Sequence, residues 1–155
     1  MRSLLLLFLL LLPQEDWKAS GTQGAVAAGG KGAVAAGLEI LKAGGNAADA
    51  AVATILALSV TDSTQFCFGG EVPILVYDAK QGKVEVVAGQ GAAPKLATLE
   101  HFEKSGGIPH HGVEAAAVPG AFDACLVTLA RHGTKTFSEV EAPALRLRTA
   151  RHVCR

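Results

Sequence analysis

A pair of glycines at positions 44 and 45 separates two segments with helical apolar patterns, residues 33–43 and residues 47–60. Glycine readily adopts the left-handed conformation in which helices commonly end, so the pair predicts a tight turn between two helices. The second segment is apolar on nearly every face, and its polar interruptions are Asp49, Thr54 and Ser59. A helix that is apolar all round is buried between other layers. A chain of 155 residues built around such a helix is expected to be one layer of something larger.

The start of the second helix carries signals of its own. Asn46 precedes it, in the position where a side-chain oxygen caps the first free amide groups. Asp49 places a negative charge in the first turn, where it complements the helix dipole. The segment is far shorter than the roughly 20 apolar residues of a membrane-spanning helix. A helical hairpin inside a layered domain is therefore expected.

The composition favours layers that pack closely on one another rather than a core filled by large side chains. Hydrophobic residues make up 50% of the chain and aromatic residues only 5%, and alanine and glycine supply much of the remaining bulk. Tight layering of backbones follows from such small residues. The 14 basic and 14 acidic residues cancel, so no overall field attracts the chain to nucleic acid or to an anionic membrane. No nucleic-acid partner is expected.

Residues 1–23 form a separate leader. Arg2 supplies a positive charge, residues 4–12 are a continuous apolar run, and Pro13 ends it. Small residues at 19–21 provide a cleavage site of the kind that signal peptides carry. The apolar run is too short to span a bilayer as a helix. We expect export to the periplasm or the extracellular space, with an uncleaved membrane anchor at residues 4–12 as the alternative.

The pattern that follows predicts a layered α+β domain over residues 24–147. The apolar run 24–28 is expected to be a strand, and two segments, 72–77 and 83–87, are expected to pair antiparallel across a turn at 78–82. Further helices are expected at residues 97–104, 121–132 and 137–148. Residues 148–155 are basic and lack apolar periodicity, so this tail is either frayed or an interrupted element.

Metal and thiol chemistry are not indicated. The cysteines, Cys67, Cys125 and Cys154, are odd in number and lack the spacing of a zinc site or a disulfide framework. Cys67 and Cys125 are expected to be small buried apolar side chains. No neighbouring cation activates Cys67 as a nucleophile. His110 and His111 have no third ligand at a familiar spacing, so no metal is expected.

Cofactor and phosphate binding have little support. Gly30-x-Gly32-x-x-Ala35 is the loosest form of a dinucleotide fingerprint, but a second apolar helix follows it where that fold places a parallel strand. The arginines Arg146, Arg148, Arg151 and Arg155 lack the aromatic or groove-fitting context of a nucleic-acid site. Glu71 and Asp78 flank a strand as loop and turn residues. No cofactor is expected.

Residues 37–53 read Gly-Leu-Glu-Ile-Leu-Lys-Ala-Gly-Gly-Asn-Ala-Ala-Asp-Ala-Ala-Val-Ala, and here the chain resembles the γ-glutamyltransferase family near the start of its large subunit. Further family motifs follow in order: Gly69-Gly70, Leu75-Val76-Tyr77-Asp78, Ala93-Pro94, Val118-Pro119-Gly120, His132-Gly133-Thr134 and Ala142-Pro143-Ala144. A set of ordered motifs is far more specific than any one of them alone.

The resemblance implies an N-terminal nucleophile hydrolase fold, with two stacked antiparallel sheets between helix layers, of which only the N-terminal portion is present. It also implies processing into two subunits and a small-subunit threonine that attacks the γ-glutamyl carbonyl of glutathione or a related amide. The amine of that threonine takes the hydroxyl proton, and hydrogen-bond donors stabilise the oxyanion. The sequence reaches neither the nucleophile nor the oxyanion glycines, so no catalytic residue is assigned in it.

One substrate-binding position falls within the resemblance. Where the family has Arg-Glu-Thr-Ala-Pro, this chain has Gln90-Gly91-Ala92-Ala93-Pro94, so Gln90 stands at the position of the arginine that binds the substrate carboxylate. A glutamine cannot make the charged bidentate contact of an arginine. Its amide can still donate to a carboxylate, an amide or a carbonyl. The alternative is a polar loop residue that binds nothing.

The leading hypothesis is a truncated γ-glutamyltransferase-like protein, inactive alone, whose full-length form acts on a small γ-glutamyl or related amide. A small-subunit segment would be its partner. The second hypothesis is a non-catalytic binding or regulatory chain that docks onto a full-length homologue. A dinucleotide-binding domain is the third.

Overall fold

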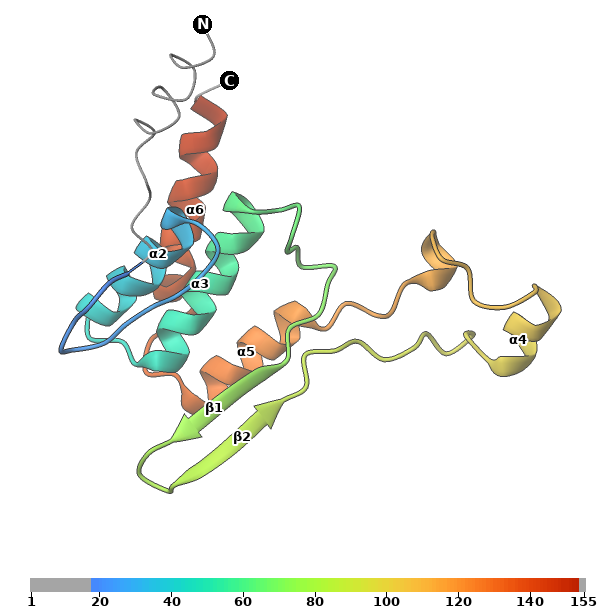
Figure 1. The fold of residues 1–155 in the computed structure, drawn as a ribbon, viewed down its shortest axis with the longest axis horizontal. Coiled ribbons are helices and arrows are strands. Elements are labelled where there is room, and N and C mark those ends of the chain that lie inside the picture. The colour runs from blue at the N-terminus through green and yellow to red at the C-terminus, as the bar shows by residue number, and fades with distance from the viewer. Residues whose placement is uncertain (1–17, 154–155) are drawn as a thin grey trace, which may run out of the picture.

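The computed structural model describes residues 18–153, so most of the expected leader, and Cys154, lie outside the described residues. The main body consists of four helices, α2 (Lys31–Lys42), α3 (Ala47–Thr61), α5 (Ala121–His132) and α6 (Phe137–Val153), and a hairpin of β1 (Ile74–Asp78) and β2 (Lys83–Val87). A short helix α4 (Leu99–Lys104) and a turn of 3-10 helix η1 (Val113–Ala115) lie on a loop that reaches away from the body (Figure 1). In the described part of the chain, no helix is long and apolar enough to cross a membrane.

The turn between α2 and α3 forms as the glycine pair predicts. Gly44 has a φ of 82°, and its amide donates to the carbonyl of Leu41 at 3.0 Å. The amide of Gly45 donates to the carbonyl of Ile40 at 2.9 Å. These bonds satisfy the last carbonyls of α2 in the pattern common to helices that end at glycine.

Asn46 caps α3 as expected. Its Oδ1 accepts from the amides of Ala48 at 2.9 Å and Asp49 at 3.1 Å. In return the Asp49 carboxylate accepts from the Asn46 amide at 2.8 Å. The two side chains therefore satisfy each other's backbone donors as a capping box.

Helices α2 and α3 cross at very short range through Gly37. A Cβ atom at this position would lie 2.3 Å from Oγ1 of Thr54 and 3.2 Å from the carbonyl oxygen of Ala50. The Thr54 hydroxyl donates to that same carbonyl at 2.8 Å, so the buried polar atom is satisfied within its own helix. The small residues noted in the sequence thus bring backbones together at this crossing.

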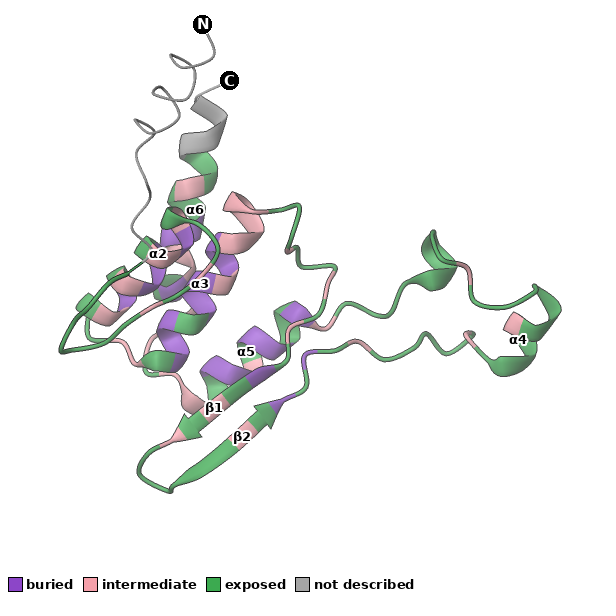
Figure 2. Ribbon diagram, in the orientation of Figure 1, coloured by how far each residue is buried: buried purple, intermediate pink, exposed green. Residues whose placement is uncertain are grey.

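Helix α3 lies at the centre of the helical layer and contacts α2, α5 and α6. Its side chains Val52, Ala53 and Ala57 are fully buried. One stripe of the helix is not covered: Ala51 is exposed, and Ile55 is only half-buried (Figure 2). The expectation that every face of this helix is covered is therefore wrong along this stripe and in the last turn, where residues 58–61 are only half-buried.

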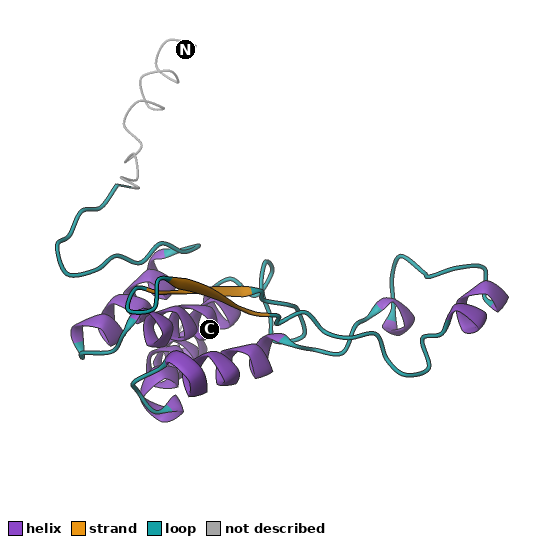
Figure 3. Ribbon diagram, turned by 90° about the horizontal axis from the view of Figure 1, so that it is seen from below, coloured by secondary structure: helices purple, strands orange, loops and turns teal. Residues whose placement is uncertain are grey.

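The hairpin forms with the expected antiparallel pairing, and Leu75 lies opposite Val86 and Tyr77 opposite Val84. Its inner face packs on α5, where Ile74 and Val87 contact Ala124. Its outer face is apolar and open, with exposed fractions of 68% for Leu75, 66% for Tyr77, 59% for Val84 and 61% for Val86. A sheet covered on one side normally turns polar residues outward. Figure 3 shows the strands lying over the helices with no other layer of described residues beyond them.

One expected strand is absent, and one expected helix is longer than predicted. Residues 24–28 form no strand, because none of the described strands pairs with them. Helix α6 does not end at Arg148 but continues to Val153, so of the two alternatives for the basic tail the frayed one is wrong for residues 148–153. Arginine and alanine are good helix formers, and a basic stretch without apolar periodicity can simply extend a helix into solvent.

Candidate functional site

Gln90 follows β2, in a loop that leads out of the hairpin. Its neighbours Gly89 and Gly91 lie where separate backbone segments meet. The Val72 amide donates to the carbonyl of Gly89 at 3.1 Å. The Val118 amide donates to the carbonyl of Ala92 at 2.9 Å. The Gln90 backbone is therefore held between the segment that enters β1 and the segment that enters α5.

The glycines around Gln90 are required by the closeness of these segments. A Cβ atom at Gly91 would lie 1.5 Å from the carbonyl oxygen of Val118. One at Gly89 would lie 2.1 Å from the carbonyl oxygen of Val72. Such distances exclude any side chain, so the main chain is fixed on both sides of Gln90.

The Gln90 side chain is exposed, and its amide has no hydrogen-bond partner among residues 18–153. Gly120, directly before α5, touches the Gln90 backbone: a Cβ atom there would lie 3.1 Å from the Gln90 carbonyl carbon. Helix α5 begins at Ala121 without a side-chain cap. Both a free amide and a helix N-terminus suit an oxygen-bearing group. The Gln90 amide and the N-terminus of α5 can therefore offer a ligand uncharged hydrogen-bond donors, but not the positive charge of an arginine.

Residues 92–118 form an arm that leaves the body after β2 and returns before α5 (Figure 1), and its two ends are joined by the hydrogen bond between Val118 and Ala92. Neither α4 nor η1 contains a buried residue. Large apolar side chains of the arm face solvent, among them Leu96, Leu99, Ile108 and Val113. The arm therefore adds nothing to the core of the body.

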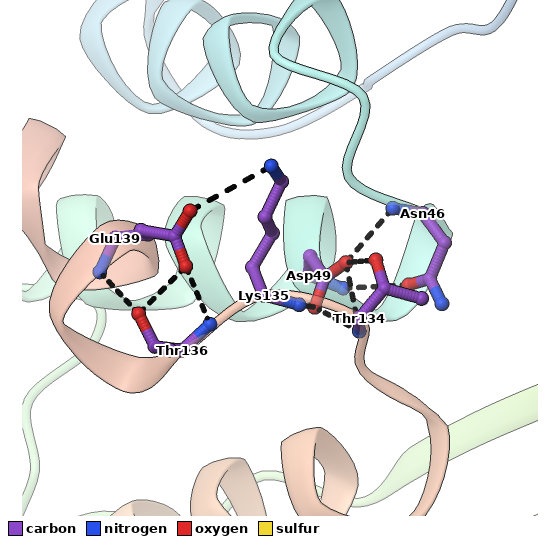
Figure 4. Close-up of polar contacts among 6 residues, drawn as sticks. All are labelled: Asn46, Asp49, Thr134, Lys135, Thr136 and Glu139. Atoms are coloured by element: carbon purple, nitrogen blue, oxygen red, sulfur yellow. Dashed lines mark hydrogen bonds and ion pairs between the residues drawn. The ribbon is translucent and has the colours of Figure 1, made fainter.

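A polar cluster centred on the buried Asp49 joins the turn before α3 to the turn before α6 (Figure 4). Asp49 is fully buried, and its carboxylate accepts the amides of Thr134 and Lys135 at 2.9 and 3.2 Å. The Thr134 hydroxyl donates to the same carboxylate at 2.7 Å. Burial alone would raise the pKa of Asp49, but the hydrogen bonds from Thr134, Asn46 and Lys135 outweigh it and lower the pKa. With its oxygens satisfied in this way, Asp49 serves the fold.

The cysteine and histidine side chains that the sequence singled out form no reactive or metal-binding site in the described part of the chain. Cys125 is buried as expected, and burial raises the pKa of its thiol to about 11. Cys67 is exposed, which corrects the expectation of burial: the loop that carries it has no described layer above it. The rings of His110 and His111 are exposed, with centroids 6.5 Å apart. Within residues 18–153, no group of His, Cys, Asp or Glu is arranged to hold a metal ion.

The charged residues considered as candidates make ordinary turn or surface contacts. Asp78 accepts the amides of Lys80 at 2.8 Å and Gln81 at 3.3 Å, and these bonds lower its pKa, as in an ordinary turn. Arg146 pairs with Glu39 of α2 on the surface, with nitrogen and oxygen 2.5 Å apart. Glu71 is exposed in the loop before β1. The structure gathers none of these side chains around Gln90.

An apolar pocket that no sequence motif indicates opens between α3, α5 and α6. Phe68, Phe122 and Phe137 meet edge to face there, with ring centroids 5.6 and 5.8 Å apart. Its lining comes from separate elements, so no local motif marks it. Its polar lining residues include Glu141 and Arg148, both on α6.

Comparison with known proteins places these features in a family. The family model described as Gamma-glutamyltranspeptidase matches residues 33–152. The chain is 39% identical over 146 residues to the Acylase ACY 1 proenzyme of Pseudomonas sp. (strain SE83), covering 86% of this chain and 26% of that protein. It is 33% identical over 133 residues to the Glutathione hydrolase proenzyme of Bacillus subtilis (strain 168), covering 82% and 23%. The chain thus spans about a quarter of the length of these relatives.

The fold agrees with the sequence comparison. The crystal structure of Helicobacter pylori gamma-glutamyltranspeptidase superposes with a TM-score of 0.77 at 30% identity, over 84% of this chain and 38% of that chain. The expected fold class, an N-terminal nucleophile hydrolase of which the N-terminal portion is present, is confirmed by such structural neighbours. The family model matches well over half of the sequence, and the chain belongs to the gamma-glutamyltranspeptidase family.

Proposed function

We propose that this chain is one component of an amide-hydrolysing or acyl-transferring enzyme, and that a companion polypeptide carrying the threonine nucleophile completes it. The observation that supports the proposal is the open outer face of the hairpin, formed by Leu75, Tyr77, Val84 and Val86. A contiguous apolar patch of this kind marks a surface that binds another protein. A second sheet suits it, because sheets pack face to face through apolar side chains at about 10 Å.

In this proposal Gln90 contacts the substrate. It is exposed, fixed by its flanking glycines and free of partners in the described residues. Because its amide is neutral, it suits a carbonyl or amide oxygen better than it suits the carboxylate that an arginine would pair with. We therefore propose a substrate that is an amide related to γ-glutamyl compounds and does not depend on a charged contact at this position.

The test is a reconstitution assay. The purified chain alone, incubated with glutathione or a γ-glutamyl anilide, is expected to give no turnover above buffer. Adding the small-subunit segment of a family member is expected to produce turnover, with a wider set of acyl anilides included to find the preferred substrate. Gln90→Ala should then raise KM, and Lys95→Ala, a polar change elsewhere on the loop, should not. Turnover by the chain alone would refute the need for a companion.

A second candidate function is a regulatory chain that docks onto a full-length homologue through the same outer face. The replacement of the family arginine by Gln90 favours it, since a chain without substrate binding needs no cation there. Co-purification with a full-length homologue, together with a change in that enzyme's rate, would support this function. Restored turnover in the reconstitution assay would favour the first proposal instead.

We also propose that the protein is exported by its leader, residues 1–23, ahead of the family domain. Expression of the whole chain, followed by fractionation and N-terminal sequencing, tests this. A mature N-terminus near residue 21 is expected, whereas a chain that keeps Met1 in the membrane fraction would support the anchor at residues 4–12.

A further inference from the structure

His132, the last residue of α5, points its imidazole at β2. Its Nε2 lies 3.4 Å from Oε2 of Glu85, and the two side chains are 14% and 44% exposed. The Nε2 atom is buried and has no hydrogen-bond partner among the described residues. We infer that this contact is a protonation-dependent clasp, which holds the hairpin on the helical layer more firmly when the imidazole is charged.

Hydrogen bonds of the neighbouring backbone hold the His132 side of the clasp in place. The carbonyl of His132 accepts from Nδ2 of Asn46 at 2.6 Å, which ties the end of α5 to the start of α3. Two residues further on, the amide of Thr134 donates to Asp49 at 2.9 Å. The backbone on both sides of the imidazole is thus anchored, so the ring presents its Nε2 to β2 from a fixed position.

The other side of the clasp is the hairpin. Glu85 lies opposite Val76 in the strand pairing, and β2 contacts α5. At the end of the hairpin away from its turn, Ile74 and Val87 pack on Ala124. The hairpin is therefore attached to α5 by an apolar contact at one end and by the polar clasp nearer its turn.

Several charged groups surround the imidazole. The Asp49 carboxylate of α3 lies beside the next residue: a Cβ atom at Gly133 would be 2.8 Å from its Oδ1. Glu85 faces the ring from β2, and the ring lies at the carbonyl end of α5. Opposing cations are Arg131 on α5 and Lys83 on β2, both exposed, while Lys135 before α6 is paired with Glu139 at 3.6 Å.

Protonation changes what the two groups can do. A neutral imidazole turns a lone pair on Nε2 toward the carboxylate when its proton is on Nδ1, and offers only an uncharged N–H when its proton is on Nε2. A proton taken from solvent onto Nε2 gives a charge-assisted hydrogen bond. Histidine is the side chain that ordinarily changes charge between about pH 5 and pH 8. The hairpin is therefore held more tightly in mildly acidic solution, independently of the function proposed above.

Hydrogen exchange of the β2 amides tests the inference. After correction for intrinsic rates, wild-type amides of residues 83–87 should exchange roughly two- to five-fold more slowly at about pH 5.5 than at about pH 8, the range expected for a partly exposed ion pair. Glu85→Gln should abolish this difference. A matched control is Glu114→Gln, which removes the exposed contact between His101 and Glu114 at 3.6 Å and should leave the β2 difference unchanged.

Either of two results would overturn the clasp: no pH difference in the wild type, or a full difference retained in Glu85→Gln. Circular dichroism confirms that each variant is folded. If Glu85→Gln does not fold, His132→Gln replaces it, because it removes the titrating group and leaves the carboxylate. Its β2 amides should exchange at the same corrected rate at both pH values, and a retained difference would likewise contradict the inference.

Discussion

The Asp49 carboxylate accepts the backbone amide of Thr134 at 2.9 Å and the hydroxyl of the same residue at 2.7 Å, across 85 positions of sequence. The motif that begins α3 is therefore bonded directly to the motif that separates α5 from α6. In the sequence these are two unrelated matches to the family. In the structure they form one hydrogen-bonded cluster around the buried Asp49.

Replacing Asp49 with asparagine should destabilise the protein by roughly 2–4 kcal/mol, because an amide nitrogen would face donors and leave buried hydrogen bonds unmade. The free energy of unfolding from urea denaturation measures this. Asp123→Asn is the control, since Asp123 is exposed on α5 and should change stability by less than about 0.5 kcal/mol. Equal effects of the two substitutions would contradict the structural role of Asp49.

The same carboxylate predicts a loss of stability in acid. Its pKa is lowered in the folded protein from an ordinary value of 3.8, so its contribution is fully present above that value and is lost as the pH falls through the lower folded value. Thermal unfolding followed from neutral pH to about pH 2.5 should show a steeper decline below about pH 4 in the wild type than in Asp49→Asn. If the thermal stability of the two proteins fell in parallel with pH, Asp49 would not be the source of the loss of stability in acid.

Gly37→Ala should be strongly destabilising, because its Cβ would lie 2.3 Å from Thr54 Oγ1 and close to the backbone of α3. We expect a loss of about 1–3 kcal/mol, the usual cost of overpacking, measured by chemical denaturation. Gly69→Ala is the matched control, since its Cβ would meet only the Cys67 sulfur at 3.7 Å. A stable Gly37→Ala protein would mean that the two helices cross at a greater separation.

Cysteine accessibility should differ sharply between the two described thiols. Cys67 is exposed and should react with a maleimide within minutes in the folded protein. Cys125 is buried, with a pKa raised to about 11, and should react only after unfolding. Peptide mapping by mass spectrometry scores each thiol separately. Rapid labelling of Cys125 would show that the helical core opens easily.

Tyr77→Glu should leave the helical content unchanged, because Tyr77 is 66% exposed and the substitution removes little from the core. It should nevertheless weaken capture of the companion polypeptide at least tenfold, since a buried carboxylate without a partner is costly in a sheet interface. Pull-down titration measures the affinity. Leu99→Glu on the arm, at a side chain 76% exposed, is the comparison for a general effect of added charge. If the Tyr77→Glu variant bound the companion polypeptide as tightly as the wild type, the outer face of the hairpin would not be the docking surface.

Features determined by nearby residues could be predicted from the sequence. The glycine turn, the Asn46 cap and the pairing of the hairpin all form as expected, because each depends on residues a few positions apart. A capping box at α6 depends on equally close residues: Glu139 accepts the amide of Thr136 at 2.8 Å, and the Thr136 hydroxyl accepts the amide of Glu139 at 3.3 Å.

Features determined by distant partners could not be predicted. Residues 24–28 have the composition of a strand, but a strand needs a neighbour, and none of the described strands lies beside it. Cys67 has apolar neighbours, Phe66 and Phe68, yet no described layer covers that loop. For the candidate site, the resemblance indicated Gln90, while the contact of its flanking glycines with Val72 and Val118 needed the structure.

The arm between Ala92 and Val118 begins and ends at a single hydrogen bond of 2.9 Å, and neither of its short helices has a buried residue. A change in the length of the arm should therefore have little effect on the stability of the body. Closing a flexible loop costs only about 0.6 kcal/mol more for each doubling of its length. A foreign peptide inserted in the arm would therefore be displayed away from the body without disturbing the core.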